Sequence, residues 1–341
     1  MSRLLGDFAR GQVVNTKRFA IWALAAATTL ATGCSGDDED STKQTSKGDR
    51  TADAGETEVD AGVQSYRISM TVPNVPPTTE GTQCVRVKLG NVGPVKIGRI
   101  HNRLSGHSHH FVVSSVTDPT ATEQALYECP PFRAPLTGAP LTVTQKHDEE
   151  IVLPEGVGYA LEDDQLMHLE LHYINTSDEV ADVTAEAELF PSTDTGEIKE
   201  AGFLLVGSLD IAIPPHSQHS TGDLFVATTP ALEGVEYYAI TGHTHRFGTN
   251  VTVGVAESAN ADATMIYEPA SFDWSAPEVG YLKPTVQVPS GGGFRFSCEW
   301  DNPTDDTILY GESALTEMCF FWAYYYPRAP MQQTLLVRPT R

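Results

Sequence analysis

Residues 167–173 read M-H-L-E-L-H-Y, and polar side chains alternate with apolar ones along this stretch. Alternate residues of a β-strand face the same side, so Leu169 and Leu171 would face one side of a sheet. His168 and His172 would face the other side. A helix would also align the two histidines, as in a zincin, but there a glutamate directly follows the first histidine, and here Leu169 does. The stretch therefore predicts a strand.

The same strand-like texture continues along most of the chain. Short runs rich in β-branched and aromatic residues are separated by Pro, Gly and Asn, and long amphipathic helical patterns are absent. Many short strands with frequent turns predict an all-β fold built of β-sandwiches. We expect strands at 66–72, 84–89, 109–114, 166–174, 183–189, 203–213, 236–242, 251–255 and 293–300.

The beginning of the chain has the pattern of an export signal. Basic residues precede a short apolar run, 19–30, that is too short to span a membrane. The run ends in L-A-T-G-C, where Gly33 and Cys34 resemble a bacterial lipobox, although Ala31 stands where leucine is usual. We expect a lipoprotein signal peptide at 1–33 and lipid on Cys34. The protein would then be anchored to a membrane of the bacterial cell envelope; a plain secretory signal is the alternative.

Charge and composition suggest how the remaining chain is divided. Residues 35–62 contain nine acidic and three basic residues and few large apolar ones, so we expect a disordered acidic tether over 34–62. A length of 341 residues suggests about two further domains. The turn-rich P-S-T-D-T-G stretch at 191–196 favours a boundary there, which gives domains 63–192 and 193–341. The net charge of −23 repels phosphate backbones, so nucleic acid is excluded as a partner.

Five cysteines in an exported chain indicate disulfides. If Cys34 carries lipid, Cys84, Cys129, Cys298 and Cys319 remain. Four cysteines allow three connectivities, and their order along the chain favours Cys84–Cys129 and Cys298–Cys319. A zinc site made of all four is the alternative, but the chain lacks the C-x-x-C pairs typical of such sites.

Two more histidine groups lie outside the 167–173 strand. G-H-S-H-H-F at 106–111 contains His109 and His110, which would point to opposite faces of a regular strand, so a shared metal requires a distorted one. G-H-T-H-R-F-G at 242–248 contains His243 and His245, whose spacing would place both imidazoles on one strand face. Each group alone is weak evidence for a metal, and the roles of His107 and His168 are not predicted.

The last candidate ligand is a methionine next to a cysteine. G-E-S-A-L-T-E-M-C at 311–319 contains Met318, which in a β-rich chain ordinarily fills a core. A bridge from Cys319 to Cys298 would instead hold the neighbouring backbone and direct the thioether. Imidazoles together with one thioether are typical of copper sites, because soft sulfur favours Cu(I) while histidine tolerates both oxidation states.

Together these motifs resemble the copper type II ascorbate-dependent monooxygenases, which include the peptidylglycine and dopamine β-monooxygenases. Their order matches that family: a His-His pair before an apolar strand, then L-x-x-H-Y, H-T-H-x-x-G and E-M-C. Looser matches are V-P-N-V-P-P, L-P-E-G-V-G and S-C-E-W, so the resemblance spans about residues 66–327. It implies two jelly-roll-type β-sandwich domains and agrees with the disulfides Cys84–Cys129 and Cys298–Cys319.

The resemblance also implies two copper ions per chain. It assigns His109, His110 and His172 to an electron-transfer copper, and His243, His245 and Met318 to a catalytic copper that binds O2. Each ion would store one of the two electrons needed to hydroxylate a C–H bond of a small-molecule substrate. The external reductant would be ascorbate or another one-electron donor.

This chain differs from the family at positions that bear on which substrate it accepts. The peptide-amidating members have an arginine that grips the substrate carboxylate where this chain has Thr241, and a tyrosine where it has Trp322. Glu170 replaces an amide two residues before His172. We therefore expect a more apolar pocket that does not accept a peptidylglycine. A copper-storage or copper-delivery lipoprotein and a purely structural lipoprotein are the alternative functions.

Overall fold

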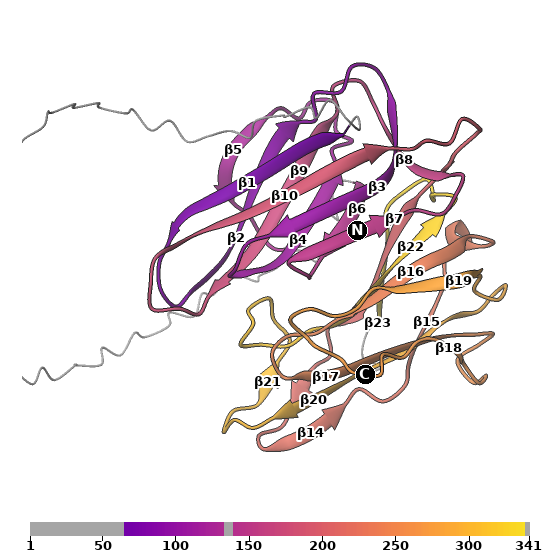
Figure 1. Ribbon diagram of the computed structural model, residues 1–341. Helices are drawn as coiled ribbons and strands as arrows, with labels where there is room; N and C mark the ends of the chain where they lie inside the picture. Colours follow the sequence, from indigo (N-terminus) through magenta and orange to yellow (C-terminus); the bar gives the residue numbers. More distant parts are fainter. Residues whose placement is uncertain (1–64, 133–138, 338–341) are drawn as a thin grey trace, which may run out of the picture. The chain divides into compact units, whose positions relative to one another are not determined.

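The computed structural model describes residues 65–132 and 139–337 (Figure 1). The expected signal peptide at 1–33, the lipidated Cys34 and the tether at 34–62 lie outside the described residues. No helix within the described ranges is long and apolar enough to cross a membrane.

The first described part of the chain forms a β-sandwich of two sheets (Figure 1). Its strands are β1 (Tyr66–Val75), β2 (Thr79–Lys88), β3 (Val95–Leu104), β4 (Ser108–Ser115), β5 (Gln124–Glu128), β6 (Ala139–Thr144), β7 (Asp148–Val152), β8 (Val157–Leu161), β9 (Leu166–Asn175), β10 (Ala181–Pro191) and β11 (Lys199–Glu200). One sheet has the order β1-β10-β3-β8-β11, with β7 also on β3, and the other has β5-β2-β9-β4-β6. This is the jelly-roll arrangement, in which the first strand pairs with the last long one.

The second part repeats this arrangement (Figure 1). Its elements are β12 (Gly202–Ser208), β13 (Ala212–Ile213), β14 (Ser217–Ser220), β15 (Leu224–Ala227), η1 (Pro230–Leu232), β16 (Glu236–His243), β17 (Gly248–Ala256), β18 (Thr264–Tyr267), β19 (Gly280–Val286), β20 (Gly293–Asn302), β21 (Ile308–Leu309), β22 (Cys319–Tyr326) and β23 (Gln333–Val337). The order β19-β16-β22-β12-β23 faces β14-β20-β17-β18, with β15 also on β20 and a separate pair β13-β21. The all-β prediction of two jelly-roll sandwiches is therefore confirmed.

The connection between the sandwiches lies close to the boundary expected after residue 192. That residue falls between β10 and β11. Lys199 and Glu200 of β11 pair in parallel with β8 and so extend a sheet of the first sandwich. The second sandwich begins with β12.

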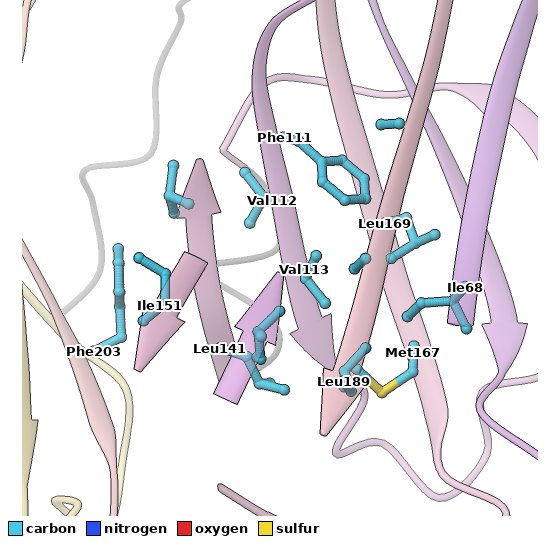
Figure 2. Close-up of a cluster of buried hydrophobic side chains, with 14 of the residues drawn as sticks. Ile68, Phe111, Val112, Val113, Leu141, Ile151, Met167, Leu169, Leu189 and Phe203 are labelled. Carbon is cyan, nitrogen blue, oxygen red and sulfur yellow. The ribbon is translucent and has the colours of Figure 1, made fainter. Parts of the chain in front are cut away.

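Strand β9 shows how the alternation of residues 167–173 determines packing. Leu169 and Leu171 are fully buried in the core between the two sheets of the first sandwich, as predicted. Figure 2 shows Leu169 among the buried side chains. On the opposite face, Glu170 and His172 are also buried, at 0% and 2% exposed. Strands of the second sandwich pack against the first, since Trp322 and Tyr324 join the same apolar cluster. The Tyr324 hydroxyl accepts a hydrogen bond of 3.0 Å from the Val143 amide. His109 and His110 of β4 lie next to His243 of the second sandwich.

One expected strand is divided in the structure, and several observed strands, β22 among them, were not among those expected. The run at 203–213 is divided, because Leu209 and Asp210 are exposed between β12 and β13. Strand β22 was not anticipated; its sequence, C-F-F-W-A-Y-Y-Y, has no alternation. It lies between β16 and β12 with both faces covered, and such central strands need no polar face.

Both disulfides have the predicted pairing. Cys84 is bonded to Cys129, and Cys298 is bonded to Cys319. The second bond joins β20 in one sheet of the second sandwich to the start of β22 in the other. Because all four sulfurs are used, the alternative four-cysteine zinc site is excluded.

Candidate metal centre

Five of the predicted ligand histidines gather in one buried cluster. His109 and His110 come from β4, His172 from β9, His243 from the end of β16, and His245 from the turn that follows. Each is at most 4% exposed. The cluster therefore takes three residues from the first sandwich and two from the second.

A β-bulge lets two adjacent histidines reach this cluster. In the pairing of β4 with β9, Ser108 lies opposite Tyr173 and His110 lies opposite His172, so His109 is an extra residue. A bulge bends its strand and re-aims the side chains around it. The bulge supplies the distorted strand that a metal shared by His109 and His110 would require.

The H-T-H motif has a different geometry from the one expected. Strand β16 ends at His243, and His245 lies in a turn closed by a hydrogen bond from the Gly248 amide to the His245 carbonyl. The prediction that both histidines share one strand face is therefore wrong. A Cβ at Gly248 would lie only 1.9 Å from the Thr244 hydroxyl oxygen, so the turn requires glycine. The turn brings His245 back to the side where His243 lies.

His109 stands next to both groups of histidines. One ligand nitrogen from each of His109, His243 and His245 lies within 4.8 Å of the other two. The His109 ring centroid is 5.4 Å from that of His110 and 5.2 Å from that of His172. The resemblance places His109 with His110 and His172 only, whereas the structure also places it beside His243 and His245.

Hydrogen bonds orient two of the imidazoles for metal binding. His243 Nδ1 donates to the side-chain oxygen of Gln145 (2.6 Å), whose amide nitrogen donates in turn to the Gly242 carbonyl (3.2 Å). His245 Nδ1 donates to the Thr316 carbonyl (3.0 Å). A proton held on Nδ1 leaves the Nε2 lone pair available, as metal-binding histidines require.

Burial keeps these imidazoles neutral. Removal from water lowers the pKa of His109, His110 and His243 well below its usual value, and neighbouring histidines lower it further. Burial also lowers the pKa of His245 to about 4. Only neutral imidazole has a lone pair for a metal, so the cluster can bind one at neutral pH.

The described residues fit copper at this place. His109 Nε2 and His243 Nε2 are buried, and neither has a hydrogen-bond partner among the described atoms. Buried polar atoms in native proteins almost always have a partner, so such lone pairs indicate a ligand. Imidazole donors with a nearby thioether match the preferences of copper.

Met318 and His243 both line an apolar cavity of about 170 Å³. The methionine is 3% exposed. The cavity is lined by Pro131, Phe132, Leu205, Leu209, His243, Tyr310, Glu312, Met318, Phe320, Trp322, Thr334 and Leu336. The cluster therefore adjoins a space that could hold a small molecule.

Glu317 holds the segment that carries Met318, and sequence reasoning assigned it no role. Its buried carboxylate accepts hydrogen bonds from the amides of His245 (2.9 Å), Phe247 (2.8 Å) and Met318 (3.3 Å), and from the Trp300 indole N–H (2.9 Å). Burial raises the pKa of Glu317 to about 7, and these four donors oppose that rise. Glu317 thereby ties the H-T-H turn to the methionine.

Glu80, also missed from the sequence, links the two sandwiches at the cluster. Its carboxylate on β2 accepts hydrogen bonds from His172 Nε2 (2.9 Å), the Ser313 hydroxyl (2.8 Å) and the Ala314 amide (2.7 Å). Partial burial favours a higher pKa, but these three donors prevail and lower the pKa of Glu80 to about 2. The carboxylate is therefore ionised. Because it holds the proton of His172 on Nε2, Nδ1 is unprotonated and accepts a hydrogen bond of 3.2 Å from His110 Nε2.

We predict that Glu80→Ala weakens copper binding about 10- to 100-fold, the usual effect of losing a partner that orients a ligand. Glu80→Gln should have a smaller effect, since it retains one acceptor oxygen. Copper affinity measured by chelator competition tests this. Glu128→Gln is the control, because Glu128 is an exposed acidic residue lining the same surface hollow as Glu80 and His172. Unchanged affinity in Glu80→Ala would contradict the orienting role.

The two other histidines considered from the sequence lie outside the cluster. His168 Nε2 is 3.2 Å from the Tyr127 hydroxyl. His168 also lies near Cys84 and Glu170, but Cys84 is in a disulfide and offers no thiolate. His107 precedes the β4 bulge with a positive φ of 70° and is partly exposed.

Comparisons with known proteins identify the second sandwich. Residues 199–336 match the family model of the copper type II ascorbate-dependent monooxygenase C-terminal domain. No curated protein matches the chain. Similar solved structures include the major capsid protein P2 of bacteriophage PM2, with 12% identity, TM-score 0.34 and coverage of 76% of this chain and 97% of that one. Another is PNGase F of Flavobacterium meningosepticum, with 11% identity, TM-score 0.26 and coverage of 82% and 94%. At such low TM-scores these structures say nothing about activity.

Proposed function

We propose that the chain is a copper-dependent monooxygenase, because residues 199–336 match the C-terminal domain of the copper type II ascorbate-dependent monooxygenases. It would hydroxylate a C–H bond of a small molecule with O2 and an external one-electron reductant, ascorbate or a substitute. The observation that carries this proposal is that His243 and Met318, two expected ligands of one ion, line the same apolar cavity.

The chain's own residues would perform three tasks. The five-histidine cluster, with Met318, would hold two copper ions. Gln145 and Glu80 would orient His243 and His172 through the hydrogen bonds described above. The apolar walls of the cavity would exclude water and seat the substrate beside His243. Copper bound there would supply the one-electron redox chemistry that hydroxylation by O2 requires.

Copper storage or delivery is the second candidate function, because the histidine cluster alone would suffice for it. The cavity favours the monooxygenase function over copper storage. A storage site needs no apolar space beside its ligands, and apolar pockets with a few polar groups are typical of small-molecule sites. A protein that only stores copper also does not need two groups of ligands from two different sandwiches.

Labelled oxygen distinguishes these functions. Purified protein loaded with copper and reduced with ascorbate should transfer one atom of isotopically labelled O2 into an organic product, detected by mass spectrometry. Free copper with ascorbate also consumes O2, so free copper at the same concentration is the control. Firm copper retention without label in any product of a broad substrate screen would favour storage.

We also propose that the protein is exported and held at the bacterial envelope membrane by lipid on Cys34. Two disulfides support export, since such bonds persist in oxidising compartments. Mass spectrometry of the protein from native membranes would detect the lipid, and an unmodified Cys34 would contradict the anchor.

A further inference from the structure

Hydrogen bonds divide the five clustered histidines into a pair and a triad. His110 Nε2 donates to His172 Nδ1 (3.2 Å), and the Glu80 carboxylate accepts the proton of the other His172 nitrogen (2.9 Å). Both ring nitrogens of His172 are therefore engaged, and the pair offers no lone pair of His172 to a metal unless these bonds break. The other three members of the cluster form the triad: His109, His243 and His245.

Each histidine of the triad presents one nitrogen to the other two. His243 and His245 hold their protons on Nδ1, through hydrogen bonds to Gln145 and to the Thr316 carbonyl, so Nε2 carries the lone pair. His109 Nε2 has no hydrogen-bond partner among the described atoms. One ligand nitrogen from each of the three lies within 4.8 Å of the others. The triad thus offers three imidazole donors, one from the first sandwich and two from the second.

The spacing and donor type of the triad fit zinc. Zinc is usually tetrahedral, forms Zn–N bonds of about 2.0–2.1 Å, and in some enzymes is held by three histidines with the fourth position open. Nitrogens around such an ion lie roughly 3.3 Å apart, so each nitrogen of the triad would move inward by less than about 1 Å. The ion lies between the nitrogens, which therefore need no water-accessible area of their own. The cluster borders the surface at His172, which lines a hollow of about 550 Å³.

Zinc and copper would use different ligands in this cluster. Copper favours a thioether such as that of Met318, whereas zinc is bound by thiolates, imidazoles and carboxylates. The family resemblance assigns His109 to one copper ion, and His243 with His245 to the other. An ion in the triad takes ligands from both of these groups, so neither copper group would remain complete.

We propose that the protein has a second metal-bound state, in which a single zinc ion held by His109, His243 and His245 joins the two sandwiches. Zinc has no redox chemistry, so this state does not hydroxylate, and it excludes copper while zinc stays bound. Copper generally binds such donors more tightly than zinc, so the zinc state forms when zinc is in excess. As a form of regulation this inference rests on the proposed function, but zinc binding itself requires neither copper nor O2.

Zinc titration of the copper-free protein tests the proposal by calorimetry, with elemental analysis after dialysis. The wild type should retain one zinc ion per chain. Zinc should also raise the unfolding temperature, because a ligand of the folded state stabilises it. His109→Ala and His245→Ala should each weaken zinc binding by more than about a hundredfold, since even the loss of a partner that only orients a ligand costs about 10- to 100-fold.

His172→Ala and Met318→Ile are the matched variants, because each removes an expected copper ligand outside the triad. Both should bind zinc as tightly as the wild type. Thermal unfolding without zinc verifies that each variant is folded, and His245→Ala replaces His109→Ala if the latter does not fold. The proposal is overturned if the wild type binds two zinc ions or none, or if His172→Ala loses as much zinc affinity as His245→Ala. These outcomes do not depend on whether the copper-loaded protein hydroxylates, so this proposal and the proposed function can fail separately.

Discussion

Met318→Ile should leave the protein folded and lower copper-dependent hydroxylation by more than about a hundredfold. Isoleucine is apolar and of similar size, and swaps of that kind usually cost less than about 1.5 kcal/mol in a core. It has no thioether, however, and even the loss of a residue that only orients a ligand costs about 10- to 100-fold. Product formation, with thermal unfolding measured in parallel, checks both parts of this expectation.

Met167→Ile is the matched control for this experiment. Met167 is fully buried on β9 within the first core, and it does not line the cavity (Figure 2). Its replacement should change stability slightly and leave turnover unchanged. Full activity in Met318→Ile would show that hydroxylation does not require the thioether.

His109→Ala should release more copper than the loss of any other single histidine of the cluster. The His109 ring centroid lies between 5.2 and 6.0 Å from those of His110, His172, His243 and His245. His172→Ala and His245→Ala should each lose about one of the two expected ions. His109→Ala should weaken copper binding by both groups of ligands. Elemental analysis after dialysis against a weak chelator measures the retained copper.

His168→Ala is the control for copper retention, because His168 lies on the same face of β9 as His172 but outside the cluster. It should retain both ions. If His109→Ala loses no more copper than His172→Ala, then His109 serves a single ion, as the family resemblance implies.

Local patterns in the sequence predicted the all-β class and several of the strands, whereas the jelly-roll arrangement was implied by the family resemblance. Alternation at 167–173 was sufficient to predict β9, because a strand places successive side chains on opposite faces regardless of its surroundings. Order along the chain favoured the two disulfide pairings, and the adjacency of His109 and His110 required a distorted strand if they were to share a metal. Strand β22 was not predictable, because a strand covered on both faces has no alternation to recognise.

The amino-acid sequence by itself determined the all-β class and the residue types of the candidate centre, and it favoured one of three disulfide pairings, which the structure then decided. Only the tertiary structure brought His109 within reach of His243 and His245, placed Glu80 against Ser313, and brought His243 and Met318 into the wall of one apolar cavity. The physical reason is the range of the interactions involved. Alternation and turn residues act over a few positions. The distance from β4 to the turn after β16 depends instead on how two large apolar faces pack together. Because the hydrophobic effect is non-directional, an apolar pattern in the sequence does not specify which face packs against which.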